Sequence, residues 1–242
     1  MATVLLGSTL SAMSTGLGAL LVLFISQSLT HSLRDILLAF TAGVMMSACM
    51  LGLIPEALEL GGFAPLCIGI YFGVVTLTTL EKRIPHLDLH HHAGATQFDE
   101  KARLIITAIM LHNIPEGLSV GVSYASSIEE TGNLIALAIG LQNAPEGFLV
   151  ALFLYNQNIS KVKAFIIATL TGSIEIVTAI IGYSLASYVV NLLPFGLAFA
   201  AGAMLFIIYK ELIPESHGDG NERVATYSFI VGIIVMTLLL DL

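Results

Sequence analysis

Long apolar stretches follow one another along almost the whole chain. A helix that crosses the hydrocarbon core of a bilayer needs about 20 mostly apolar residues. Short polar connections separate eight such stretches, and only the segment around 81–101 forms a longer loop. The predicted spans are residues 3–28, 35–59, 62–80, 102–126, 131–155, 161–190, 193–214 and 223–241. The pattern predicts an all-α polytopic membrane protein, an eight-helix transmembrane bundle that forms one domain over residues 1–242.

The composition agrees with this fold class. Of the 242 residues, 56% are hydrophobic and 11% are charged, whereas soluble domains carry about a quarter charged residues. The net charge of -8 does not suggest nucleic-acid binding. Cys49 and Cys67 both lie in apolar runs, which indicates neither a disulfide framework nor a cysteine-based zinc finger. The N-terminal residues have no basic region, so they predict a first span and not a cleaved signal peptide.

The positive charges give the expected orientation. With eight spans, all nine Lys and Arg residues fall on one side of the membrane. They are Arg34, Lys82, Arg83, Lys101, Arg103, Lys161, Lys163, Lys210 and Arg223. The other side carries acidic residues only, which are Glu59, Glu129, Glu130 and Asp241. The positive-inside rule therefore predicts a cell-membrane protein with both termini outside the cytoplasm. A miscounted span would mix the charges, so their separation also supports the count.

One polar motif occurs twice within the apolar stretches. The fourth span contains His112-Asn-Ile-Pro-Glu116-Gly, and the fifth contains Gln142-Asn-Ala-Pro-Glu146-Gly. The two spans run in opposite directions, and each motif begins about eleven residues into its span, which is roughly 16 Å deep at about 1.5 Å per residue. The two copies are therefore antiparallel and lie at the same depth, close to the middle of the bilayer.

The motif residues favour metal binding. On a helix, the first residue and the Glu of each motif lie nearly in line, with the Asn about 100° round the helix. Each Pro frees the carbonyl four residues earlier, at Leu111 and Leu141, which needs a polar cavity at this depth. A carboxylate at the bilayer centre costs at least about 2.5–3.5 kcal/mol, and no span interior contains a Lys or Arg. A divalent metal would compensate, and this ligand mixture suits zinc, iron or manganese. The alternative is a pair of proline kinks with Glu as a packing residue.

Three further residues are candidates at similar depth. Glu175, in the sixth span, is a third intramembrane acid, or a protonated Glu that bonds a neighbouring helix. Met45, in the second span, is a soft candidate ligand, although Met in a membrane helix usually serves packing. Cys49 lies one turn further on and is better explained as a small apolar packing residue.

These motifs resemble the ZIP (Zrt-/Irt-like) family of metal transporters, in its GufA-like branch. Phe40-Thr-Ala-Gly-Val-Met45 and Ala198-Phe-Ala-Ala-Gly-Ala-Met204 are similar to two other spans of that branch. The resemblance implies a binuclear metal centre in which Glu116 and Glu146 bridge two metals. One metal would be held by Met45, His112, Glu116, Gln142 and Glu146, and the other by Asn113, Glu116, Asn143, Glu146 and Glu175.

This chain departs from the family pattern at three positions. Many relatives have His in place of Gln142, and an acid can replace Asn143, so two neutral amides here lower the negative charge of the site. Relatives tend to have Glu-Pro in the sixth span, whereas Glu175 is followed by Ile176. We therefore expect no proline kink in that span.

Two groups of polar residues are predicted on the cytoplasmic side. The loop between the third and fourth spans has a composition typical of metal binding, or is a flexible polar loop with incidental His. Its candidate residues are His86, His90, His91 and His92. Glu211, Glu215 and His217, at the end of the seventh span, form either an exit relay for metal or ordinary interfacial charges.

The sequence favours a transporter that carries zinc into the cytoplasm by alternating access, with cadmium, iron and manganese as further possible substrates. The candidate ligands lie on several helices, and the paired motifs contain no thiolate, so the metal can be bound weakly enough to be released. Helices interrupted by proline and glycine at corresponding positions also mark the substrate sites of transporters. An intramembrane metalloenzyme would need an activated water and a base, and the chain has no His-Glu-x-x-His pair, so we predict no enzyme. A metal-sensing receptor would need an output domain. A homodimer is implied by the resemblance only.

Overall fold

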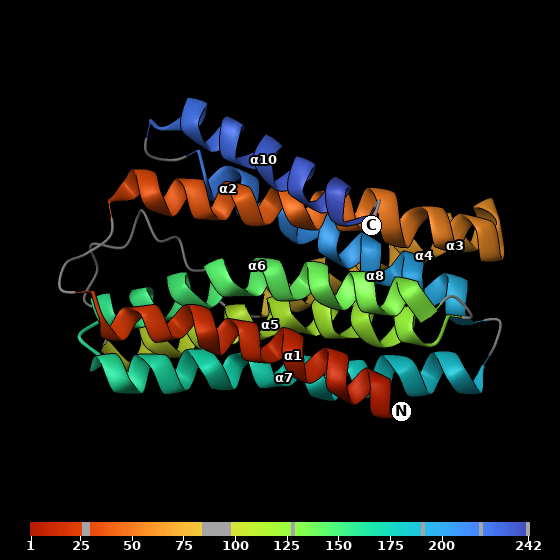
Figure 1. Ribbon diagram of the computed structural model, residues 1–242, viewed down its shortest axis with the longest axis horizontal. Helices are drawn as coiled ribbons and strands as arrows, with labels where there is room; N and C mark the ends of the chain where they lie inside the picture. The colour runs from red at the N-terminus through yellow and green to blue at the C-terminus, as the bar shows by residue number, and fades with distance from the viewer. Residues whose placement is uncertain (26–29, 84–97, 127–128, 190–191, 218–219, 241–242) are drawn as a thin grey trace.

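The computed structural model describes residues 1–25, 30–83, 98–126, 129–189, 192–217 and 220–240. All regular secondary structure in these residues is helical (Figure 1). The helices in chain order are α1 (Ala2–Leu20), η1 (Leu21–Leu23), α2 (His31–Ser47), η2 (Ala48–Leu53), α3 (Ile54–Gly61), α4 (Phe63–Arg83), α5 (Phe98–Tyr124), α6 (Glu129–Asn156), α7 (Lys161–Tyr188), α8 (Leu193–Ile207), η4 (Ile208–Leu212), α9 (Ile213–Glu215) and α10 (Glu222–Leu240).

The predicted all-α polytopic fold is confirmed. Seven of the described helical stretches are long and apolar enough to cross a membrane, and α5, with 27 residues, is the eighth predicted span. The second span begins at His31, earlier than predicted, because Thr30 caps it by accepting a hydrogen bond from the Leu33 amide at 3.3 Å. α7 runs unbroken from Lys161 to Tyr188 and contains no proline, as expected around Glu175.

α2 and α8 end in the same unusual way. Each is followed by a π-helical segment, η2 or η4, and then by the sequence Ile-Pro-Glu. Pro55 and Pro214 lie in the first turn of α3 and α9. Proline has no N–H and crowds the carbonyl four residues earlier, so the turn before it widens. The helices continue through both segments, and the spans therefore reach Gly61 and Glu215.

The helices form two groups (Figure 1). In the first group, α1 packs against α6 and α7, and α5 packs against α7 and α6. In the second, α4 and α3 pack against α8, and α2 packs against α10. The groups meet where α5 contacts α8 and where α2 contacts α6. This division places both copies of the paired motif in the first group and Met45 in the second.

The described basic side chains lie at one end of the bundle, which we call the basic end. They are Arg34, Lys82, Lys161, Lys163, Lys210 and Arg223, at the start of α2, α7 and α10, at the end of α4 and in η4. Two ion pairs lie there, Arg34 with Glu215 at 2.5 Å and Lys210 with Glu81 at 2.6 Å. The opposite end, where α3 ends, is called the acidic end (Figure 1).

Candidate metal centre

Two glycines let the helices of the first group come close enough to build a shared polar site. A Cβ on Gly117 would meet the Glu175 backbone of α7, and a Cβ on Gly147 would meet the Thr15 backbone of α1. These are the glycines that follow Glu116 and Glu146 in the two motifs. The glycine after each motif Glu therefore allows close helix approach, which joins α5 to α7 and α6 to α1.

The α5 and α6 motifs face each other in the middle of the bundle, and both helices continue through their prolines. The Gln142 side-chain amide donates a hydrogen bond to Glu116 Oε1 at 2.7 Å. Glu146 Oε1 lies 4.0 Å from His112 Nδ1. Glu116 and Glu146 are thus held by different partners, and the bridging role of these two residues stays a prediction.

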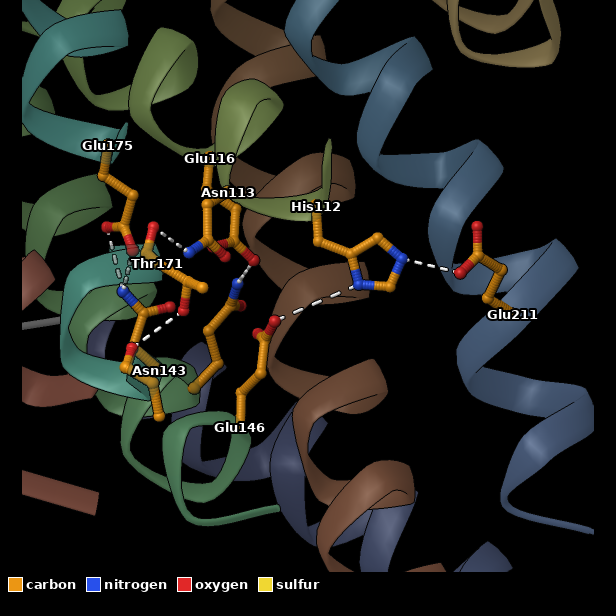
Figure 2. Close-up of polar contacts among 10 residues, drawn as sticks. His112, Asn113, Glu116, Asn143, Glu146, Thr171, Glu175 and Glu211 are labelled. Carbon is orange, nitrogen blue, oxygen red and sulfur yellow. Dashed lines mark hydrogen bonds and ion pairs between the residues drawn. The ribbon is translucent and has the colours of Figure 1, made fainter. Parts of the chain in front are cut away.

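Glu175 is held by a second polar group. Asn143 Nδ2 lies 2.9 Å from both oxygens of the Glu175 carboxylate. The Ser11 hydroxyl of α1 donates to the same carboxylate at 2.9 Å, and Asn143 Nδ2 is 3.2 Å from the Ser11 carbonyl and hydroxyl oxygens. Asn113 Nδ2 donates to the Thr171 carbonyl at 2.9 Å. Both predicted Asn ligands therefore point into this centre (Figure 2).

Sequence reasoning missed Ser11. A usable signal exists in the first span, because Ser8, Ser11 and Thr15 recur at the three- and four-residue spacing of one helix face. All three are buried in the structure. A polar stripe on an otherwise apolar membrane helix indicates a face that turns toward other polar groups.

Several oxygen atoms in this centre accept no hydrogen bond, although they are buried. These atoms are Glu116 Oε2, Gln142 Oε1, Asn143 Oδ1 and Glu146 Oε1. All four belong to residues that the sequence predicts as metal ligands. Buried acceptors normally have a partner, and a divalent cation is one that satisfies carboxylate and amide oxygens together. The donor set therefore fits a metal, although no three His, Cys, Asp or Glu side chains among the described residues converge in a ligating arrangement.

Met45 is buried in a hydrophobic cluster with Cys49, Leu53 and Met204. It lies on the second group of helices, across from the motifs. The packing role that Met usually has is therefore present, and a ligand role for Met45 stays a prediction.

The structure brings one of the three predicted exit residues to the centre. Glu211 Oε2 lies 2.6 Å from His112 Nε2, which joins η4 to α5 (Figure 2). Glu215 instead pairs with Arg34, and His217 Nδ1 lies 2.9 Å from the Ile213 carbonyl oxygen within its own segment. The predicted loop residues His86, His90, His91 and His92 lie outside the described residues.

Exposure increases from the centre toward the basic end. Glu116 and Glu175 are fully buried. The side chains of His112 and Glu146 are 16% exposed, and that of Glu211 is 37% exposed. On the other side of the centre, one hydrophobic cluster covers residues of both helix groups. The outer polar groups of the centre are therefore the exposed ones, and apolar packing between the two helix groups lies on its acidic side.

A bundle of apolar helices with buried carboxylates, amides and a histidine in its middle defines a multi-pass membrane protein with a polar centre inside the bundle. The comparison with known proteins agrees. The ZIP zinc transporter family model matches residues 81–240, which is more than half of the chain. The chain belongs to the ZIP family. Its members are transporters, so the prediction that the chain is not an enzyme is confirmed.

Similar proteins cover nearly the whole chain. The zinc transporter GufA of Myxococcus xanthus is 40% identical over 98% of this chain and 97% of its own length. The zinc transporter ZIPB of Bordetella bronchiseptica is 32% identical, over 97% of this chain and 79% of its own length. The zinc transporter ZupT of Chlorobaculum parvum is 32% identical, over 94% of this chain and 92% of its own length. The resemblance to the GufA-like branch is thereby confirmed.

Proposed function

We propose that this protein carries a divalent transition metal, with zinc as the first candidate, across the cell membrane into the cytoplasm. The observation that supports this most directly is the set of four buried oxygens without hydrogen-bond partners on α5 and α6. They come from both copies of the motif, and among the described residues no Lys or Arg pairs with the acids of the centre. The names of the relatives identify them as zinc transporters.

The proposed metal ligands are those predicted from the sequence. They are Met45, His112, Asn113, Glu116, Gln142, Asn143, Glu146 and Glu175. Two metal positions are proposed, one toward His112 and one toward Glu175. The two hydrogen-bonded groups, one around Glu116 and one around Glu175, support this division. The amides of Gln142 and Asn143 would exchange their carboxylate partner for the metal by turning their oxygens toward it.

Alternating access is proposed as the mechanism, with the first helix group moving against the second. On the acidic side of the centre, the hydrophobic cluster joins the groups through Leu53, Val122, Ile135 and other residues. On the basic side, the large cluster around Val150 contains residues of the first group only. This difference supports an inward-facing state, with the basic end in the cytoplasm.

Zinc uptake into liposomes tests the proposal. Purified protein is reconstituted with a zinc-sensitive dye inside the vesicles, and initial rates are compared with the double variant Glu116→Gln, Glu146→Gln. We expect the variant to fall to the rate of protein-free liposomes, because both carboxylates of the motifs are lost. Glu222→Gln is the matched control, since Glu222 is exposed at the start of α10. Uptake by the double variant at the normal rate would reject the proposed centre.

The identity of the metal needs a second measurement. Cadmium, iron and manganese are added as competitors of zinc in the same assay, at equal concentrations. Carboxylate, imidazole and amide ligands without a thiolate do not by themselves select one of these ions. Weak competition by the other ions would support zinc as the preferred substrate, and stronger competition by one of them would replace zinc with that ion.

A further inference from the structure

Glu56 is a buried acid outside the metal centre. It lies in the first turn of α3, near the acidic end, and only 8% of the residue is exposed. The Ser126 hydroxyl acts on its carboxylate, whose oxygens have no other hydrogen-bond partner among the described residues. No described Lys or Arg forms an ion pair with it. A buried carboxylate without a counter-charge is costly, so this position favours the binding of a cation or a proton.

The corresponding acid at the other end of the bundle has such a partner. Glu215 also follows a π-helical segment and the residues Ile-Pro, as Glu56 does. Glu215 pairs with Arg34 at 2.5 Å. The fold therefore supplies a positive charge to one of the two equivalent acids. Glu56 has no such partner among the described residues, so a cation or a proton from solution would have to supply its positive charge.

Glu56 faces a polar stripe on α5. Ser126, which lies just after the last residue of α5, and Glu59 act on its carboxylate. Ser119 and Ser123 follow Glu116 at three- and four-residue steps, so these three residues lie on one face of α5, the face whose C-terminal end leads to Ser126. Ser119 donates to the Glu116 carbonyl at 2.7 Å, whereas the Ser123 hydroxyl is buried without a partner. Hydroxyl groups therefore continue from Glu56 toward the metal centre.

Glu56 lies well away from the metal centre along the second span. Met45 and Glu56 are eleven residues apart along one continuous helical stretch, which is roughly 16 Å at about 1.5 Å per residue. Buried Cys49 and Leu53 of the hydrophobic cluster lie between them. An ion at Glu56 would thus be separated from the centre by these apolar residues.

We propose that Glu56, with the hydroxyl groups of Ser126 and Ser123, forms a recruiting subsite that receives the divalent cation at the acidic end before it moves to the metal centre. The inference rests on the proposed function, because it places the uptake side at this end. An oxygen-only set with one carboxylate binds weakly, which suits a position that must pass its ion onward.

Kinetics separate this role from that of the centre. We measure zinc uptake into liposomes over a range of zinc concentrations for the wild type, Glu56→Gln and Glu222→Gln. Removing one charge next to a divalent ion is expected to raise KM roughly tenfold in Glu56→Gln. The maximal rate should stay within about twofold, since the centre is unchanged. Glu222→Gln is the matched control, because Glu222 is an exposed acid in the first turn of α10 at the basic end, and its KM should change by less than about twofold.

A binding measurement makes the test independent of transport. In a Cys67→Ser background, Ser126→Cys places a thiol at the subsite while Cys49 stays buried. We expect cadmium to slow the modification of this thiol by a water-soluble maleimide, and we expect the protection to disappear when Glu56→Gln is added. If wild-type protein takes up no zinc, the proposed function fails, and the cadmium protection still tests the subsite. Equal KM in Glu56→Gln and wild type, or protection that does not need Glu56, would overturn the subsite.

Discussion

Replacing Gly147 with alanine is expected to push α6 away from α1 at the level of the metal centre. A Cβ at this position would lie 2.7 Å from the Thr15 carbonyl carbon and 2.8 Å from its Cα. These are backbone atoms, so no side-chain rotation relieves the overlap. Overpacking of this kind costs about 1–3 kcal/mol, and the better helix propensity of alanine offsets up to about 1 kcal/mol. With the full offset, we expect a net destabilisation of up to about 2 kcal/mol from these two terms.

The same displacement should impair transport. Gly147 directly follows Glu146 and lies one turn after Asn143 on α6. Moving α6 outward lengthens the contact of Asn143 Nδ2 with Ser11, which is now 3.2 Å. Ser11 and Asn143 both donate hydrogen bonds to the Glu175 carboxylate, so its position depends on both residues. Zinc uptake should therefore fall together with stability.

Gly140 provides the control on the same two helices. A Cβ there would meet the Ser14 hydroxyl at 3.3 Å and the Ser11 Cα at 3.6 Å, and the hydroxyl can rotate away. Gly140→Ala should therefore leave stability unchanged or raise it by up to about 1 kcal/mol. The chain has no Trp, so unfolding is followed by the labelling of buried Cys49 with a thiol-reactive dye in a Cys67→Ser background. Equal melting temperatures and equal zinc uptake for Gly147→Ala and Gly140→Ala would refute the close contact of α1 and α6.

Two further predictions concern single contacts of the centre. Ser11→Ala removes the hydroxyl that donates to Glu175, and it should lower stability by about 1.5–3 kcal/mol in the dye-labelling assay if the carboxylate is charged. Glu211→Gln removes the charge beside His112, and it should lower the maximal rate of zinc uptake with little change in KM, because Glu211 lies on the exposed side of the centre.

Each of these variants has a control in the chain. Ser8 is buried on α1 like Ser11, but its hydroxyl donates to the Val4 carbonyl of its own helix, so Ser8→Ala should cost less than Ser11→Ala. Similar losses from both substitutions would contradict a special role for Ser11. For Glu211→Gln, a maximal rate equal to that of Glu222→Gln would show that the contact with His112 does not contribute to release.

The fold class and the depth of the site follow from local properties of the sequence. Apolar length predicts the spans, because a membrane helix must match the thickness of the bilayer. The positions of Glu116 and Glu146 within their spans place both motifs at mid-depth, since helical rise is constant. The glycines after these residues predict close packing, and the structure has it at both positions.

Only the tertiary structure decided which groups meet. The sequence did not indicate that Ser11 of the first span would hold Glu175, or that Glu211 would reach His112 while Glu215 turned to Arg34. These contacts join helices that are far apart in the chain, so they depend on the order and rotation of the helices in the bundle. A hydropathy pattern determines that a helix crosses the membrane, but every lipid-compatible rotation satisfies it almost equally well. Packing of small residues and the pairing of buried polar groups select one rotation, and both need the neighbouring helix to be in place.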